Sequence, residues 1–210
     1  MRWSRLQPTD SDKNGSTNAG QKPGLAKAPL LTPAPSVIEA GPSVPTRRPS
    51  LAPPDASRTL DMADEIAGRF PSAKIDYVRP RRIKVTVPAD KIKVVALYIR
   101  DALGFDHLNV VGGTDYMQQG EFEVIYFVGS VSTPGQQDLV IQLAERVKRD
   151  DSPKVPSLTE VWGGAEYHER ETFEMLGIVF EGHPDLRRLL LPEDWNDIPP
   201  LRKDYISPGR

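Results

Sequence analysis

The distribution of proline sets the strongest limit on what this chain of 210 residues can fold into. Ten prolines fall within positions 1–58, scattered among Ser, Thr, Ala, Gly and Lys with few large apolar side chains. Such a segment cannot bury enough apolar surface to offset the entropy of ordering it, so residues 1–58 are predicted to be a disordered tail. From residue 59 the composition becomes that of a folded domain, and prolines recur after residue 182.

The charge of this amino-terminal segment allows two interpretations. Positions 1–58 carry eight Lys and Arg against four Asp and Glu, a net charge of +4. The segment could tether the protein to an acidic partner or an anionic lipid surface, or it could be a solvated linker. The composition favours the solvated linker.

Composition excludes several classes of function. The chain has no cysteine, which removes disulfides, thiolate zinc sites, cysteine nucleophiles and cysteine-ligated iron–sulfur clusters from this polypeptide. The net charge of -2 and the lack of a basic stripe in the folded part argue against nucleic acid as a partner. Apolar runs such as Val124–Val128 are far shorter than the roughly 20 residues of a membrane helix. We therefore expect an intracellular protein that is soluble or peripheral to a membrane.

Residues 59–182 show the alternating patterns of an α+β domain, a mixed sheet packed by helices. Thr59 is a candidate N-cap, and Gly112-Gly113 is predicted to be a loop or bulge. The segment 139–147 fits a helix or a strand, and the need of its neighbours for a partner favours the strand. The expected helices cover 60–68, 89–104 and 158–176, and the expected strands cover 75–78, 83–87, 107–111, 120–128 and 139–147.

The third helix carries an unusual carboxylate. Ser157 and Glu160 have the spacing of a capping box, which predicts that the helix begins near Leu158. Glu169 lies in the middle of its apolar stripe, which consists of Trp162, Ala165, Phe173 and Leu176. A buried carboxylate needs a partner, and an arginine such as Arg187 or Arg188 is the natural one.

Three interpretations are open for Glu166, His168, Glu169 and Glu171. His168 and Glu171, with His183, could hold a metal ion or act as acid and base, although His168 and Glu169 project on different faces. The charges could instead form a solvated helix face. They could also form an ion-pair hub that joins the helix to the following loop and to a partner chain, and the position of Glu169 favours this third interpretation.

Residues 183–210 combine frequent prolines with leucines, Trp195 and Tyr205. The prolines argue against a long helix or a central strand, and the apolar content argues against a free tail. We therefore predict an extended segment laid over a surface, either that of its own domain or that of another subunit, with the second favoured. Arg187, Arg188, Arg202 and Lys203 would anchor it to carboxylates.

The same residues carry a resemblance to a known family. The order Glu169-Arg170-Glu171, Glu174, Met175-Leu176, His183, Arg187 and Leu189-Leu190 resembles the signature of the thirty-kilodalton subunit of respiratory complex I, the NADH-quinone oxidoreductase. Residues 200–205 resemble the closing motif of that family. The resemblance covers about Ile75 to Tyr205 and leaves the tail outside. Its signature and interface residues here are Glu169, Arg170, Glu171, Glu174, His183, Arg187, Arg188, Trp195, Arg202, Lys203, Asp204 and Tyr205.

The resemblance implies a non-catalytic subunit in the peripheral arm of a quinone oxidoreductase that couples electron transfer to ion translocation. It implies a position on the cytoplasmic side of the membrane, reached only through the complex. The expected partners are the large, hydrogenase-large-like subunit of forty-nine kilodaltons and neighbouring iron–sulfur subunits, which would hold the flavin and the clusters. The alternative is a free-standing metal-dependent hydrolase that uses His168, Glu171 and His183.

Overall fold

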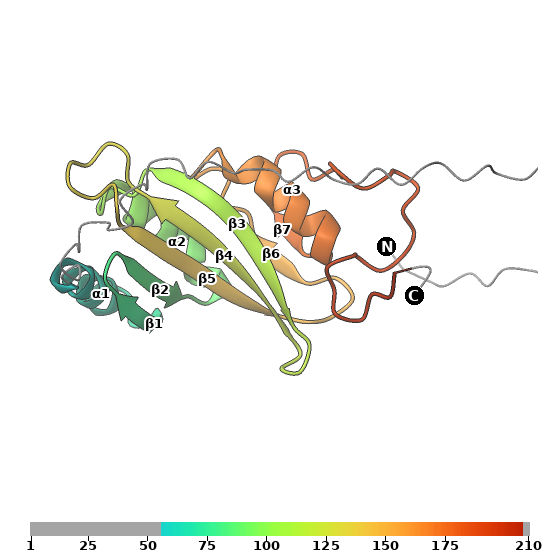
Figure 1. Ribbon diagram of the computed structural model, residues 1–210, viewed down its shortest axis with the longest axis horizontal. Helices are drawn as coiled ribbons and strands as arrows, with labels where there is room; N and C mark the ends of the chain where they lie inside the picture. Colours follow the sequence, from blue (N-terminus) through green and yellow to red (C-terminus); the bar gives the residue numbers. More distant parts are fainter. Residues whose placement is uncertain (1–55, 208–210) are drawn as a thin grey trace, which may run out of the picture. The chain divides into compact units, whose positions relative to one another are not determined.

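The computed structural model describes residues 56–207, so nearly all of the predicted tail 1–58 lies outside the described residues. Across this range one mixed sheet has the strand order β1-β2-β5-β4-β3 (Figure 1). β2 and β5 run parallel, and the other neighbours are antiparallel. The α+β fold with a mixed sheet is therefore confirmed. The strands are β1 (Lys74–Arg79), β2 (Arg82–Thr86), β3 (His107–Tyr116), β4 (Glu121–Gly129) and β5 (Val140–Lys148).

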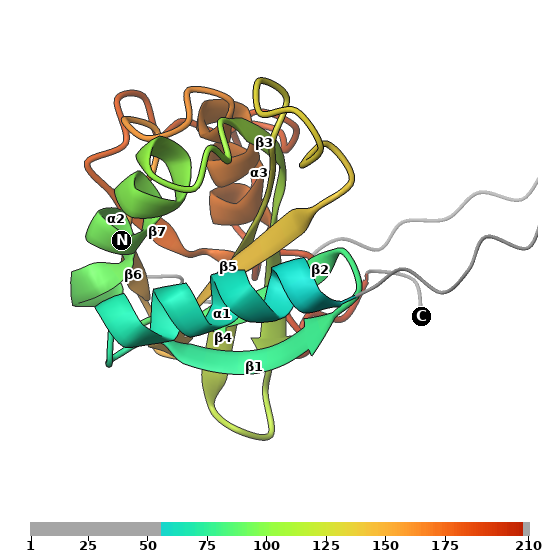
Figure 2. The same cartoon turned by 90° about the vertical axis from the view of Figure 1, so that its left-hand side faces the viewer.

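Helices α1 (Ser57–Arg69), α2 (Ala89–Asp101) and α3 (Ala165–Leu176) contribute to a single core on one face of the sheet. Figure 1 shows α2 and α3 along the sheet, and Figure 2 shows α1 lying against β1. A second, short sheet pairs β6 (Lys154–Pro156) with β7 (Val179–Glu181) in parallel. These two strands are too short to leave a periodic pattern, so they were not predicted.

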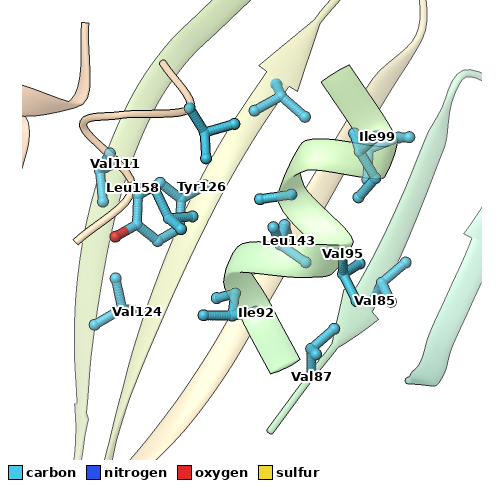
Figure 3. Packing of buried hydrophobic residues seen from close by; sticks show 14 of the residues in the cluster. Val85, Val87, Ile92, Val95, Ile99, Val111, Val124, Tyr126, Leu143 and Leu158 are labelled. Atoms are coloured by element: carbon cyan, nitrogen blue, oxygen red, sulfur yellow. The ribbon is translucent and has the colours of Figure 1, made fainter. Parts of the chain in front are cut away.

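The inner face of the sheet is apolar along β4, where side chains alternate between the two faces. Phe122, Val124, Tyr126 and Val128 of β4 are fully buried, whereas Ile125 and Phe127 on the opposite face are half-buried. An apolar stripe of α2 packs on this inner face (Figure 3). That stripe consists of Ile92, Val95, Ala96 and Ile99, all with no exposed surface.

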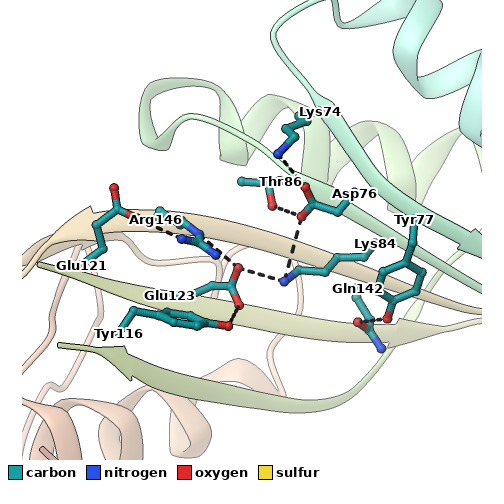
Figure 4. Close-up of polar contacts among 10 residues, drawn as sticks. All are labelled: Lys74, Asp76, Tyr77, Lys84, Thr86, Tyr116, Glu121, Glu123, Gln142 and Arg146. Atoms are coloured by element: carbon teal, nitrogen blue, oxygen red, sulfur yellow. Dashed lines mark hydrogen bonds and ion pairs between the residues drawn. The ribbon is translucent and has the colours of Figure 1, made fainter. Parts of the chain in front are cut away.

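The outer face of the sheet carries a polar network in place of helices, within the described residues (Figure 4). Lys84 of β2 reaches Glu123 of β4, with 2.8 Å between Nζ and Oε1. Its side chain passes over β5 at Ala144, the strand position between the partners of Lys84 and Glu123. The short side chain of Ala144 leaves room for that crossing.

The predicted end of the strand before Gly112 and the predicted start of the helix after Thr59 are both wrong, because contacts with distant segments set them. Gly112 and Gly113 lie inside β3 in regular pairing with β4, so they form neither the loop nor the bulge that was predicted. A Cβ on Gly113 would come within 2.3 Å of Leu176 Cδ1, so the glycine lets α3 pack closely on the strand. Thr59 lies inside α1, not before it, and its hydroxyl donates to the carbonyls of Ala56 and Arg79. None of the helices within residues 56–207 combines the length and apolar character of a membrane span.

Candidate functional site at helix α3 and the carboxy-terminal strap

Helix α3 begins later than the capping-box spacing predicts. Residues 157–164 form turns, and the helix starts at Ala165. Glu160 does not cap it, because its carboxylate pairs with Lys93 of α2 at 2.5 Å. Trp162 is buried outside the helix, and its indole N–H donates to the carbonyl of Phe105 at 3.0 Å. The turns thus tie the start of α3 to α2 and to the loop that follows α2.

Glu169 is fully buried, as its place on the apolar stripe predicts. Its carboxylate accepts hydrogen bonds from the Tyr126 hydroxyl at 3.0 Å, the Ser157 hydroxyl at 2.6 Å and the Leu158 N–H at 2.9 Å. These three donors join α3 to β4 and to the turn at residues 157–158. The hydroxyl of Ser157, predicted to be a helix cap, therefore serves the carboxylate.

The predicted arginine partner of Glu169 is wrong. Arg187 binds Asp185, with 2.7 Å between Nε and Oδ1, and Arg188 donates to the carbonyls of Pro192 and Glu193. Three uncharged donors, the hydroxyls of Tyr126 and Ser157 and the N–H of Leu158, take the place of the predicted guanidinium at the Glu169 carboxylate. The carboxylate of Glu169 is thus held by hydrogen bonds from uncharged groups and not by the predicted ion pair.

A second buried carboxyl group, Glu145 of β5, lies near Glu169. It has no exposed surface, and neither carboxyl oxygen has a hydrogen-bond partner among the described residues. Burial, and then the proximity of Glu169, raise the pKa of Glu145 to about 8. Burial also raises the pKa of Glu169, although the hydrogen bonds from Ser157 and Leu158 oppose the shift. Glu145 is consequently the neutral acid at pH 7.

Glu145 was missed in the sequence. It follows Ile141 and Leu143 at alternate positions of β5, and it is paired with Val124 of the neighbouring strand β4. A charged residue in that alternating apolar series was the available signal. The series extends to Val147, so the inward direction of Glu145 could have been inferred.

Arg170 and Glu174 of α3 clamp the beginning of the strap, which we define as residues 183–207. The guanidinium of Arg170 donates to the carbonyl oxygens of Arg187 at 3.0 Å and Arg188 at 3.1 Å. The buried carboxylate of Glu174 accepts three consecutive backbone N–H groups. Their donors are Leu189 at 2.9 Å, Leu190 at 2.9 Å and Leu191 at 3.1 Å.

The far end of the strap returns to the end of α3. The N–H of Leu201 donates to the carbonyl of Met175 at 2.9 Å, and the guanidinium of Arg202 donates to the carbonyl of Leu176 at 2.6 Å. Arg202 also lies against Gly177, the left-handed residue that ends the helix, where a Cβ would come within 2.7 Å of its Nη2. The guanidinium therefore occupies the space that glycine leaves.

Asp115 of β3 is the second anchor of the far end. Its carboxylate accepts the backbone N–H of Lys203 at 2.9 Å and pairs with Arg149, which in turn pairs with Asp204 at 2.6 Å. Neither Asp115 nor Arg149 was singled out from the sequence, because each comes from a segment remote from the strap. The signature residues Lys203 and Asp204 are thus brought together with them by the fold.

His183 has a structural role at the start of the strap. Its Nδ1 accepts the N–H of Asp185 at 3.0 Å, so its Nε2 donates to the carbonyl of Glu166 at 3.0 Å. Glu171 is exposed on the helix, and no group of three or more potential metal ligands forms within residues 56–207. The structure therefore does not bring His168, Glu171 and His183 together as a metal site.

The strap leaves several apolar side chains in solvent. Leu190 is 61% exposed and Leu201 is 60% exposed, while the backbone groups beside them bond to the domain. The rings of Trp195 and Tyr205 lie 5.9 Å apart, so the second half of the strap folds back on itself. The strap is thus bound to its own domain and still presents an apolar surface.

The sequence from Arg170 through the strap falls within a recognised family. Residues 85–210 match the family described as the respiratory-chain NADH dehydrogenase, 30 kDa subunit. The chain belongs to this family. The resemblance seen in the signature at α3 and in the closing motif is therefore confirmed.

Individual relatives agree with that family. The chain is 41% identical over 144 residues to the C subunit of the F(420)H(2) dehydrogenase of Methanosarcina mazei, covering 68% of this chain and 88% of the relative. It is 46% identical over 125 residues to the C subunit of the NADH-quinone oxidoreductase of Roseiflexus castenholzii, covering 58% of this chain and 68% of the relative. These relatives give no support to a metal-dependent hydrolase.

A solved structure shares the fold. It comes from the membrane-bound sulfane sulfur reductase, an archaeal respiratory membrane complex, and matches with a TM-score of 0.63 and 24% identity. The match covers 71% of this chain and 86% of the other.

Proposed function

We propose that this protein is a structural, non-catalytic subunit in the peripheral arm of a membrane-associated oxidoreductase. The assembly would transfer electrons from NADH or a related donor to a quinone and couple the transfer to ion translocation. Membership of the 30 kDa subunit family supports this proposal, as do relatives named as subunits of NADH-quinone oxidoreductase and F(420)H(2) dehydrogenase.

The strap is the observation that carries the proposal. Arg170, Glu174 and Asp115 bind its backbone at both ends, so the segment is held in one path over the domain. Beside these anchors, the side chains of Leu189, Leu190 and Leu201 are exposed to solvent. An apolar surface on a fixed backbone suits docking to another protein, because little conformational entropy remains to be lost on binding.

The partner that fits this position is the hydrogenase-large-like subunit of forty-nine kilodaltons, with iron–sulfur subunits as neighbours. Flavin and clusters would lie in those subunits, in keeping with the complete lack of cysteine here. The chain would sit on the cytoplasmic side and reach the membrane only through the complex.

Purification of the tagged protein from native membranes, followed by mass spectrometry, tests the proposal. The wild-type chain should recover oxidoreductase subunits. The double substitution Leu190→Glu and Leu201→Glu should lower that recovery at least about tenfold, because each buried leucine contributes roughly 1.5–3 kcal/mol to association. Circular dichroism should remain that of the wild type, since both side chains are exposed.

The matched control is Val94→Glu with Val131→Glu, two valines outside the strap that are 55% and 63% exposed. This control should recover the partner subunits in full. Undiminished recovery with the leucine variants would reject the strap as the docking surface. Failure of the wild-type chain to recover any oxidoreductase subunit would reject the proposed function itself.

A further inference from the structure

The turn between β1 and β2 borders an open hollow of about 550 Å³. It lies where β1 ends and where β2 and β5 begin, and none of its lining residues belongs to α3 or to the strap. Three of its six lining residues are arginines that follow one another around a single proline. The lining consists of Arg79, Pro80, Arg81, Arg82, Asp138 and Val140.

The backbone of this turn is held in an uncommon conformation. Arg81 has a φ of 68°, in the left-handed region that a turn normally gives to glycine or asparagine. Its carbonyl accepts the N–H of Val140 at 2.9 Å, and the carbonyl of Arg79 accepts the Thr59 hydroxyl at 3.1 Å. β5 and α1 thus fix the turn from two sides, and the arginines project from a rigid support.

The guanidinium groups at this turn are unusually free of acceptors. Within residues 56–207, nine of the twelve arginines have a hydrogen-bonded or ion-paired oxygen, and three do not. Two of those three, Arg79 and Arg82, line the hollow, and the third is Arg69. Arg79 lies over the ring of Tyr77, 5.0 Å from its centroid, a contact that leaves its N–H groups available.

The charge around the hollow is strongly one-sided. Arg79, Arg81 and Arg82 supply three positive charges, and Asp138, paired with Arg81 at 2.9 Å, supplies the one negative charge of the lining. The local charge of +2 contrasts with a net charge of -2 for the whole chain. A compact dianion complements this charge better than a single carboxylate does.

We propose that this hollow binds an oxyanion of the phosphate class, either as free phosphate or as a phospholipid headgroup. The planar fork of a guanidinium matches two phosphate oxygens, and Arg79 and Arg82 can each offer that fork without breaking an ion pair among the described residues. The site is independent of the strap and of its proposed docking role.

A titration of the full chain with inorganic phosphate tests the site. The NMR signals of the arginine side chains report binding, and the ionic strength is held constant. Sedimentation with vesicles of phosphatidylcholine, with and without phosphatidylglycerol, distinguishes the two sources of phosphate. Arg82→Gln should weaken binding at least about tenfold, the effect of losing one charged hydrogen-bonded contact. Saturable phosphate binding without vesicle binding would identify free phosphate, and tighter binding to the anionic vesicles would identify the headgroup.

Arg69→Gln is the matched control, since Arg69 also lies over a tyrosine ring, that of Tyr98, and lies outside the hollow. It removes the same charge and should change binding by no more than about twofold, the scale of long-range effects between screened surface charges. Equal losses in the two variants would show general charge attraction and overturn the site. Lack of saturable binding by both phosphate and vesicles would overturn it as well.

Discussion

The two faces of the sheet treat a buried carboxyl group in opposite ways. Glu123 of β4 and Glu145 of β5 come from neighbouring strands, and both are at most 1% exposed. On the outer face, Glu123 is met by Lys84 at 2.8 Å, Arg146 at 3.4 Å and the Tyr116 hydroxyl at 3.4 Å (Figure 4). On the inner face, Glu145 has no hydrogen-bond partner among the described residues, and the charged group that acts on it is another carboxylate, that of Glu169.

The difference shows how environment, and not residue type, sets the charge. Around Asp76, also on the outer face, burial acts to raise the pKa, but the hydrogen bonds from Thr86 and Lys74 hold it below its ordinary value. For Glu145, burial and a like charge both favour the neutral acid. The carboxylates of the outer face are therefore ionised and paired with cations, whereas Glu145 on the inner face is protonated.

The largest expected effect comes from removing the acceptor that organises the inner face. Glu169→Ala would leave the Tyr126 hydroxyl and the Leu158 N–H buried without a partner, which should lower the free energy of unfolding by about 3–5 kcal/mol. Glu171→Ala, on the exposed side of the same helix, should change it by less than about 0.5 kcal/mol. Urea denaturation measures both, and equal losses would contradict the assignment of Glu169.

Replacing Glu145, the buried acid without a hydrogen-bond partner, should raise the free energy of unfolding and not lower it. Glu145→Gln mimics the neutral acid, so at about pH 7.5 it should raise the free energy of unfolding by roughly 2–4 kcal/mol. At about pH 3.5 the free energies of unfolding of the variant and the wild type should be nearly equal, because the side chain is then largely protonated in both the folded and the unfolded state. A destabilised variant at the higher pH would contradict the raised pKa.

The wild-type chain should show the matching pH dependence. The pKa of Glu145 rises from an ordinary 4.5 to about 8, so between these values the folded state holds a proton that the unfolded state has released. Its contribution to the free energy of unfolding must therefore decrease as pH rises through this window, and level off above it. Denaturation at several pH values should show a slope that Glu145→Gln reduces.

The outer face should respond to loss of a cation. Lys84→Met strands the buried Glu123 with only Arg146 as a charged partner, and we expect a loss of about 2–3 kcal/mol. Adding Glu123→Gln removes the stranded charge and should restore roughly half of that loss. If the double variant is no more stable than Lys84→Met, the carboxylate is not held by the lysine.

The smallest contrast compares two adjacent glycines on opposite faces. A Cβ on Gly113 would meet Leu176 and Thr172 of α3, whereas one on Gly112 would meet nothing within 4 Å. Gly113→Ala should therefore cost about 1–2 kcal/mol through overpacking, and Gly112→Ala should be neutral or slightly stabilising. Thermal unfolding of the two variants checks the order, and similar midpoints would contradict the close packing of α3.

The sequence predicted well the features that depend on local periodicity. The apolar patterns of residues 120–128 and 89–104 predicted strand β4 and helix α2 at nearly their observed bounds. The burial of Glu169 followed from its helical position in the same way. Each of these inferences needed only the geometry of one element.

Features that depend on two distant segments were predicted poorly. The donors to Glu169 come from β4 and from residues 157–158, and nothing in the local sequence distinguishes them from an arginine of the strap. The anchor made by Asp115 and Arg149 depends on the order of strands in the sheet. The start of α3 was misplaced because a capping-box pattern also suits a turn whose hydroxyl bonds elsewhere.

The clamp on the strap has a consequence for how this surface can change during evolution. Arg170 and Glu174 bind carbonyl and N–H groups, which every residue other than proline possesses. The side chains at positions 189–191 are consequently under little constraint from the clamp itself. A lineage could replace those leucines to match a changing partner while the path of the strap stayed the same. The side chains that contact the partner can therefore evolve independently of the hydrogen bonds that hold the backbone to α3.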